Sequence, residues 1–91
     1  MLTTTLFPLG QLVATRNAYD TIPSPDMLAG IKRHQVGDWG ELDPEDRESN
    51  DQALIYGGRV LSVYFSTGGI KFWIITECDR SYTTILLPED Y

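Results

Sequence analysis

The sequence predicts a single α+β domain over residues 1–91: an N-terminal strand, two short helices and a three-stranded antiparallel β-meander. Three observations support this. A chain of 91 residues is long enough for only one modest core. Two stretches in its middle carry the same helix-start signal, a capping residue followed by proline. Its last third alternates apolar and polar residues between two turn signals. The N-terminal strand could join the meander and make a four-stranded sheet.

The first element is a short strand over residues 11–15, which follows Pro8 and Gly10. Side chains alternate along a strand, so we expect Val13 and Leu12 on opposite faces.

The first helix is predicted in "SPDMLAGIKRHQ", with Ser24 as its N-cap and Gly37 as its stop. Its apolar stripe is thin, and we expect it to carry Met27, Ile31 and His34, with Leu28 beside them.

The second helix is predicted in "LDPEDRESNDQALIYGG". Asp43 is its expected N-cap, Leu42 packs on the first turn, and the glycine pair at 57–58 ends it. Its inward stripe is also thin and is expected to contain Arg47, Asn50, Ala53 and Leu54.

The meander occupies residues 60–87, and its register follows from where the turns lie. Two-residue turns at Gly68-Gly69 and Asp79-Arg80 would place one apolar set on a single face, and a slip of one residue would scatter it. That set is Leu61, Val63, Phe65, Phe72, Ile74, Ile85 and Leu87. The side chains expected to pack on this face are Met27, Leu28, Ile31, Trp39 and Leu54. The opposite face would gather Tyr64, Trp73, Ile75 and Leu86, an aromatic cluster that needs a cover from the chain or from a partner.

Net charge narrows the possible partners. The chain carries a formal charge of −6, whereas direct binding to a nucleic-acid backbone needs a basic surface. A basic protein partner is compatible with this charge, and so is simple solubility. The single cysteine, Cys78, excludes an internal disulfide, and no segment has the roughly 20 apolar residues that span a bilayer. No signal-peptide pattern opens the sequence, so we expect a cytoplasmic protein without membrane contact.

Motifs for catalysis and metal binding are weak. His34 and Asp38 lie four residues apart near other carboxylates, but one histidine in a glycine-broken loop is a poor match to a metal site. Cys78 lies between Glu77 and Asp79, and neighbouring negative charge makes a thiolate scarcer. We therefore expect no metal, no cofactor and no enzymatic activity, and keep a small metal-dependent hydrolase using His34 as an alternative.

Candidate partner-binding residues fall into two groups. The first lies in the acidic stretch "GDWGELDPEDRESND": Asp38, Trp39, Glu41, Asp43, Glu45, Asp46, Glu48 and Asp51. The second is the aromatic pair of the expected sheet face, Tyr64 and Trp73. Trp39 has two interpretations, since a tryptophan between glycines can plug the core or anchor a partner.

The pieces "GDWG", "WIITE", "DRS" and "TTILLPEDY" resemble a family of short proteins of plasmids and other bacterial mobile elements, labelled plasmid-related protein. Some members carry the label of a type I restriction endonuclease subunit M. The resemblance covers residues 34–91, and the N-terminal third shares only "LGQLVAT". The family has no established active site, so the resemblance implies a mobile-element context and no catalytic residue.

The leading hypothesis is therefore a small acidic binding protein of a mobile element. It would inhibit a host-defence complex, CRISPR or restriction, by presenting negative charge to a nucleic-acid-binding surface. The alternatives are a homodimeric accessory protein that uses the aromatic sheet face, and the hydrolase above.

Overall fold

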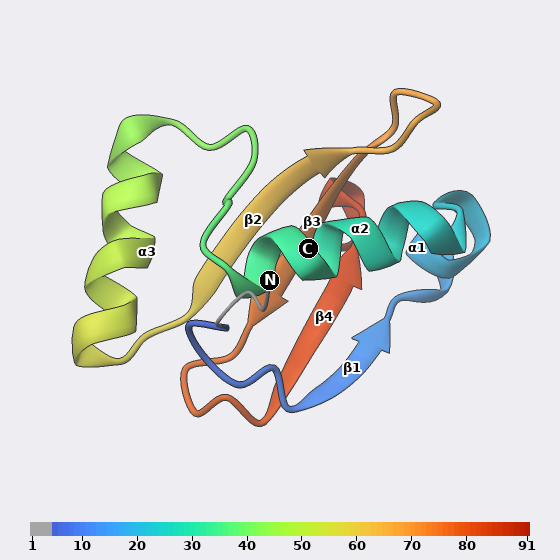
Figure 1. Cartoon of the computed structure of the whole chain (residues 1–91). Helices are drawn as coiled ribbons and strands as arrows, with labels where there is room; N and C mark the ends of the chain where they lie inside the picture. The colour runs from blue at the N-terminus through green and yellow to red at the C-terminus, as the bar shows by residue number, and fades with distance from the viewer. Residues whose placement is uncertain (1–4) are drawn as a thin grey trace.

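A computed structural model describes residues 5–91 and confirms the α+β class (Figure 1). One four-stranded sheet, with strand order β1-β4-β3-β2, is built from the N-terminal strand and the C-terminal meander. In chain order the elements are β1 (Gln11–Ala14), α1 (Arg16–Thr21), α2 (Ser24–Gln35), α3 (Pro44–Tyr56), β2 (Val60–Phe65), β3 (Lys71–Thr76), β4 (Tyr82–Leu86) and the 3-10 helix η1 (Pro88–Asp90). Within these residues, no helix is long and apolar enough to cross a membrane.

The N-terminal strand does join the meander, as the fourth strand. It pairs with β4 in parallel, from Gln11 opposite Tyr82 to Ala14 opposite Ile85. Helix α1, which follows it, was not predicted, because six residues with one buried side chain, Ala18, carry no apolar period. Thr15 caps this helix by accepting a hydrogen bond from the amide of Ala18.

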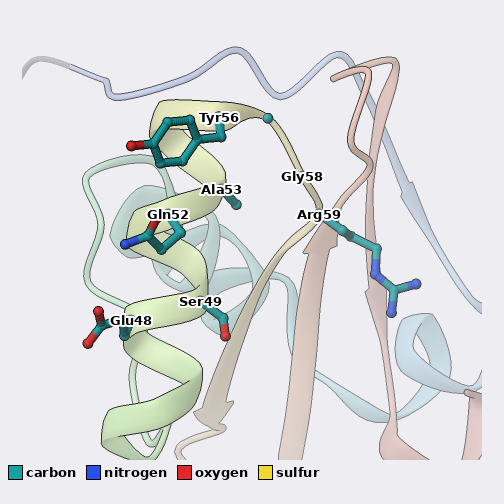
Figure 2. Close-up of a pocket in the computed structure, with 8 residues that line it drawn as sticks. Glu48, Ser49, Gln52, Ala53, Tyr56, Gly58 and Arg59 are labelled. Carbon is teal, nitrogen blue, oxygen red and sulfur yellow. The ribbon is translucent and has the colours of Figure 1, made fainter.

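The two longer helices begin close to where the sequence places them. Asp43 caps α3 as predicted and accepts a hydrogen bond from the amide of Asp46. Ser24 is the first residue of α2, whose N-cap is Pro23. Helix α2 crosses one face of the sheet, and α3 lies beside β2, into which it leads through two glycines (Figures 1 and 2).

The second predicted turn is correct and the first is not. Strands β3 and β4 pair with Ile74 opposite Ile85, as a turn at Asp79-Arg80 requires. Strands β2 and β3 pair with Tyr64 opposite Phe72, one residue away from the predicted register. The cause is a three-residue connection: Gly69 adopts φ +85°, and Ser66 and Ile70 close the turn.

This one-residue shift divides the predicted core face. Phe72, Ile74, Ile85 and Leu87 pack together, whereas Leu61, Val63 and Phe65 of β2 point to the opposite face. Phe65 is 51% exposed and Leu28 is 54% exposed, so the prediction that both belong to the core is wrong. Tyr64, and not Val63 or Phe65 as predicted, packs against Phe72 on the core face.

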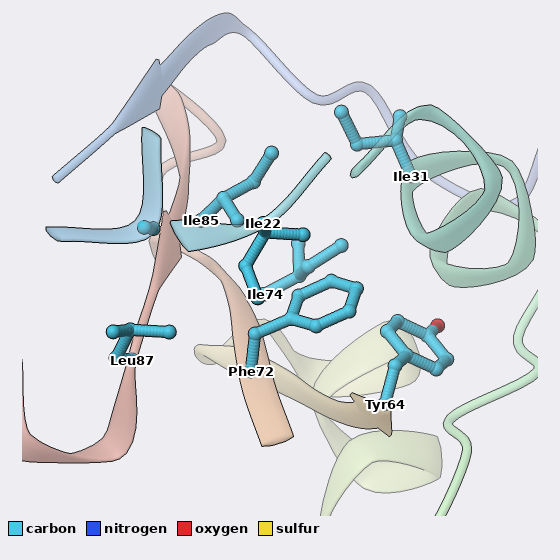
Figure 3. Close-up of a cluster of buried hydrophobic side chains, with 8 residues drawn as sticks. Ile22, Ile31, Tyr64, Phe72, Ile74, Ile85 and Leu87 are labelled. Carbon is cyan, nitrogen blue, oxygen red and sulfur yellow. The ribbon is translucent and has the colours of Figure 1, made fainter. Parts of the chain in front are cut away.

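Two buried clusters hold the domain together. The first lies between the sheet and helices α1 and α2 (Figure 3), and consists of Ala18, Ile22, Ile31, Tyr64, Phe72, Ile74, Ile85 and Leu87. The second lies where α3 and the preceding loop meet β2, and consists of Phe7, Trp39, Leu42, Ala53, Val60 and Val63. The second cluster positions the acidic stretch described below.

The outer edge of β2 is covered by the chain itself. Asn50 of α3 accepts a hydrogen bond from the Leu61 amide at 3.0 Å and donates one to the Leu61 carbonyl at 2.6 Å. Two residues on, the Val63 amide donates to Trp39 and its carbonyl accepts from Glu41. Gly40 permits this approach, because its φ is +75° and a Cβ there would lie 1.9 Å from the Val63 carbonyl oxygen.

Candidate functional site

The acidic side chains are exposed along the loop after α2 and along α3, between buried residues such as Trp39 and Leu42. We call this set the acidic surface and define it by seven exposed side chains: Asp38, Glu41, Asp43, Glu45, Asp46, Glu48 and Asp51. All seven are candidates from the sequence, and the fold leaves every one of them in contact with solvent.

Three of these carboxylates are engaged within the chain. Asp38 accepts two hydrogen bonds from Arg33, at 2.7 and 3.1 Å, which lowers the pKa of its carboxyl. Asp43 caps α3. Asp51 accepts a long contact of 3.5 Å from the Trp39 indole nitrogen.

The other four, Glu41, Glu45, Asp46 and Glu48, have no salt bridge or side-chain hydrogen bond among the described residues. Their positive neighbours are committed elsewhere. Arg47, although it lies on α3, donates to the carbonyl oxygens of Leu42 and Gly40 at 2.9 and 2.8 Å. These four carboxylates therefore present negative charge to the solvent without a salt bridge in the described chain.

The acidic surface stands on a frame, which we define as helix α3 and the loop that precedes it. Hydrogen bonds hold this frame at both ends. Asn50 and Arg47 tie the first half of α3 to β2 and to the preceding loop. Arg80 binds the other end, donating to the carbonyl oxygens of Ala53 and Gly58. A cation at a helix C-terminus is favoured by the helix dipole, and here it needs no carboxylate partner.

His34, the expected metal ligand of the hydrolase alternative, lies buried behind this frame. Its Nδ1 lies 2.5 Å from the Ser62 hydroxyl and its Nε2 lies 2.9 Å from the Thr76 hydroxyl. Thr83 donates its one hydroxyl proton to the carbonyl of Leu9, so Thr76 must donate to Thr83. It follows that Nε2 of His34 carries the proton and that Nδ1 accepts one from Ser62.

Burial determines the charge of this imidazole. Loss of solvation, with a smaller contribution from the positive charge of Arg80, lowers the pKa of His34 to about 4. Phe7 and Trp39 flank the ring edge-on, with centroids 5.2 and 5.7 Å away. Both nitrogens are occupied by hydroxyl groups, so the ring is a neutral structural hydrogen-bonding group in this fold.

Among residues 5–91, no group of three or more histidine, cysteine, aspartate and glutamate side chains is close enough to hold a metal ion. A hollow of about 360 Å³ lies along α3 and the start of β2. Figure 2 shows that its polar side chains diverge: Glu48 and Gln52 point away from the strand, and Arg59 extends to the far side.

The aromatic candidates are separated by the register of β2. Trp39 and Tyr64 are buried at 3% and 2% exposure, and the Tyr64 hydroxyl donates to the Asp38 carbonyl at 2.6 Å. Trp73 lies on the opposite face, partly covered by Tyr91 in an edge-on contact of 5.7 Å between centroids. Tyr64 and Trp73 therefore do not form one exposed patch, and Trp39 takes the core-plug role.

No protein-family model, curated protein or solved structure matches the chain.

Sequence reasoning located the acidic side chains and expected Arg47 on the inward side of α3, but it gave no role to Arg80, which holds the C-terminal end of that helix. Arginine is ordinarily exposed, so the sequence carries no signal for these bonds. Asn50 was expected on the inward stripe of α3, and an asparagine in such a stripe is the one signal that pointed to a backbone partner.

Proposed function

We propose that the protein is a small, non-enzymatic binding protein whose acidic surface docks on a basic surface of another protein. The observation that carries this proposal is the set of four exposed carboxylates, Glu41, Glu45, Asp46 and Glu48, which lack a partner in the described chain and stand on a fixed frame. A pre-positioned charged surface favours association, because binding does not need to order it first.

The partner in this proposal is a nucleic-acid-binding complex of host defence, of the CRISPR or restriction type, in the cytoplasm of a bacterium that carries the mobile element. This part rests on the resemblance of residues 34–91 to plasmid-related proteins and on the charge of −6. Proteins that bind nucleic acid display clustered lysine and arginine, and that surface is complementary to the one described here.

The test compares two triple variants with the same change of net charge. The first, Glu41→Gln, Glu45→Gln and Glu48→Gln, removes charge from the acidic surface. The matched control, Asp20→Asn, Glu77→Gln and Glu89→Gln, removes three charges elsewhere. Inhibition of DNA cleavage by purified CRISPR effector and type I restriction complexes is measured for the wild type and both variants, at low and at high salt.

We expect the first variant to bind about tenfold more weakly at low salt and to lose most of its salt dependence, since three rim charge pairs of about 0.5 kcal/mol each add up to such a factor. The control should stay within about twofold of the wild type. Equally weakened binding in both variants would mean that binding depends on the net charge of the protein and not on the acidic surface. Absence of inhibition by the wild type in both systems would contradict the host-defence target.

A further inference from the structure

The outer edge of β1 is the second edge of the sheet, and no other segment of residues 5–91 pairs with it. Leu12 is 50% exposed and Val13 is 37% exposed. The amides of Gln11 and Thr15 donate to β4, at Ser81 and Ile85. Backbone groups alternate along a strand, so the amides and carbonyls of the intervening Leu12 and Ala14 point away from the sheet. Four backbone hydrogen-bonding groups therefore face solvent in one row.

Among the described residues, none covers this edge in the way that α3 and the loop before it cover β2. Asn50, Trp39 and Glu41 satisfy the outward groups of β2. Natural sheets also blunt an edge with lysine, proline or an inward charge, and residues 11–14 contain none of these. The edge is thus available for pairing with another strand.

The strand is also held in a fixed position. The hydroxyl of Thr15, at its end, donates to Asp90 at 2.6 Å, and Asn17 donates to the same carboxylate at 2.7 Å. At its start, the carbonyl of Leu9 accepts a hydrogen bond from Thr83 at 2.7 Å. Because both ends are anchored, a partner strand would meet an ordered row of donors and acceptors.

We infer that a second copy of this chain pairs with β1 through an antiparallel two-fold contact, and so makes a continuous eight-stranded sheet. Leu12 of one copy lies opposite Ala14 of the other, and Val13 meets Val13 on the axis. This register joins all four outward groups of each strand in hydrogen-bonded pairs, and it places the larger Leu12 side chain beside the small Ala14. It is an isologous contact, which closes at two copies.

The distribution of charge permits a second copy at this edge. The strand itself carries no charge, and the acidic surface lies around β2, at the far edge of the sheet (Figure 1). Three strand spacings of about 4.8 Å separate the two edges, which already exceeds the Debye length of about 8 Å at physiological salt. Two copies joined at β1 therefore keep their acidic surfaces apart and exposed at opposite ends.

The first measurement is the concentration dependence of mass in sedimentation equilibrium. Strands of four residues form a small interface, so we expect dimerisation between about 10 µM and about 1 mM. Leu12→Pro removes an amide hydrogen that the monomer leaves unbonded, so it should abolish the dimer while the circular dichroism stays that of the folded domain.

A second pair of variants covers the possibility that proline disturbs the strand. Val13→Lys places two like charges on the axis and should abolish the dimer. Ile70→Lys adds the same charge at a residue of similar exposure, 44%, in the β2–β3 turn, and should leave the dimer intact. A wild type that stays monomeric at about 1 mM, or a dimer that persists in both β1 variants, overturns the inference.

Crosslinking tests the register. With the exposed Cys78 changed to serine, Val13→Cys should form an intermolecular disulfide, because residues in a non-hydrogen-bonded pair have Cα atoms about 4.5 Å apart. Leu12→Cys is the control, since the two copies of residue 12 lie beyond the limit of about 7 Å. Equal crosslinking by both variants contradicts this pairing. The result is independent of whether the acidic surface binds a host protein.

Discussion

Within the stretch 34–54, the inward-facing and outward-facing polar side chains differ in how completely they are satisfied. His34 and Asn50 are buried, and all of their hydrogen-bonding atoms have partners. Glu41, Glu45 and Glu48 are exposed and have none within the described chain. Stability should therefore depend on the first group, while the second can change with little cost to the fold. This separation is what leaves a charged surface free to bind.

The largest effect is expected for Trp39→Ala, which empties the centre of the second cluster and removes one face of the His34 pocket. Truncating a buried tryptophan should lower the free energy of unfolding by about 3–5 kcal/mol. The control is Tyr56→Ala on the outer side of α3, which is 79% exposed and should change stability by less than about 0.5 kcal/mol. Urea unfolding measures both, and similar losses would mean that Trp39 is not an anchor.

The next largest effect is a dependence of the free energy of unfolding on pH, which comes from His34. The folded protein binds a proton on this ring near pH 4, whereas the unfolded chain binds it near 6.5. The neutral ring therefore makes its full contribution to the free energy of unfolding above pH 6.5, and this contribution is lost as the pH falls from 6.5 to 4. The loss should total roughly 3 kcal/mol.

Urea midpoints between pH 7 and pH 4.5 measure this dependence. His34 is the only histidine, so His34→Leu should flatten the profile over this range, even though the variant is less stable at pH 7. A wild-type profile that is already flat would place the imidazole in solvent.

A smaller effect is expected for Asn50→Ala, which strips the cover from the Leu61 amide and carbonyl. Losing two edge hydrogen bonds should lower the free energy of unfolding by about 1–2 kcal/mol, since water can reach part of the edge. Hydrogen exchange at the Leu61 amide should accelerate in Asn50→Ala. The control is Gln52→Ala, which changes an exposed residue of the same helix and should leave the exchange rate of the Leu61 amide unchanged. An unchanged exchange rate would show that Asn50 does not protect β2.

The smallest effect is expected for the triple variant Glu41→Gln, Glu45→Gln and Glu48→Gln. Its free energy of unfolding should lie within about 0.5 kcal/mol of the wild type, because these carboxylates make no contact to lose. The same urea experiment measures it. A loss above about 1 kcal/mol would erase the distinction between the two groups of side chains.

Much of the fold was predictable because its signals are local. A capping residue followed by proline marks the start of a helix whatever the helix packs on, which is why Asp43 was identified correctly. The turn at Asp79-Arg80 was also correct, since Ile74 and Ile85 agree with it on either side. The acidic surface was predictable for a similar reason, because charged side chains stay in water.

The sequence by itself determined the α+β class, the start of α3, the start of α2 to within one residue, the register of the second hairpin and the charge of the exposed stretch. Tertiary structure alone decided the register of β2, because Thr67, Gly68 and Gly69 fit a two-residue or a three-residue turn equally well. The choice placed Ser62 and Tyr64 inside, where His34 and the Asp38 carbonyl satisfy their hydroxyl groups. Those partners lie 28 and 26 residues away in the chain. A local pattern contains no information about groups that meet only after folding.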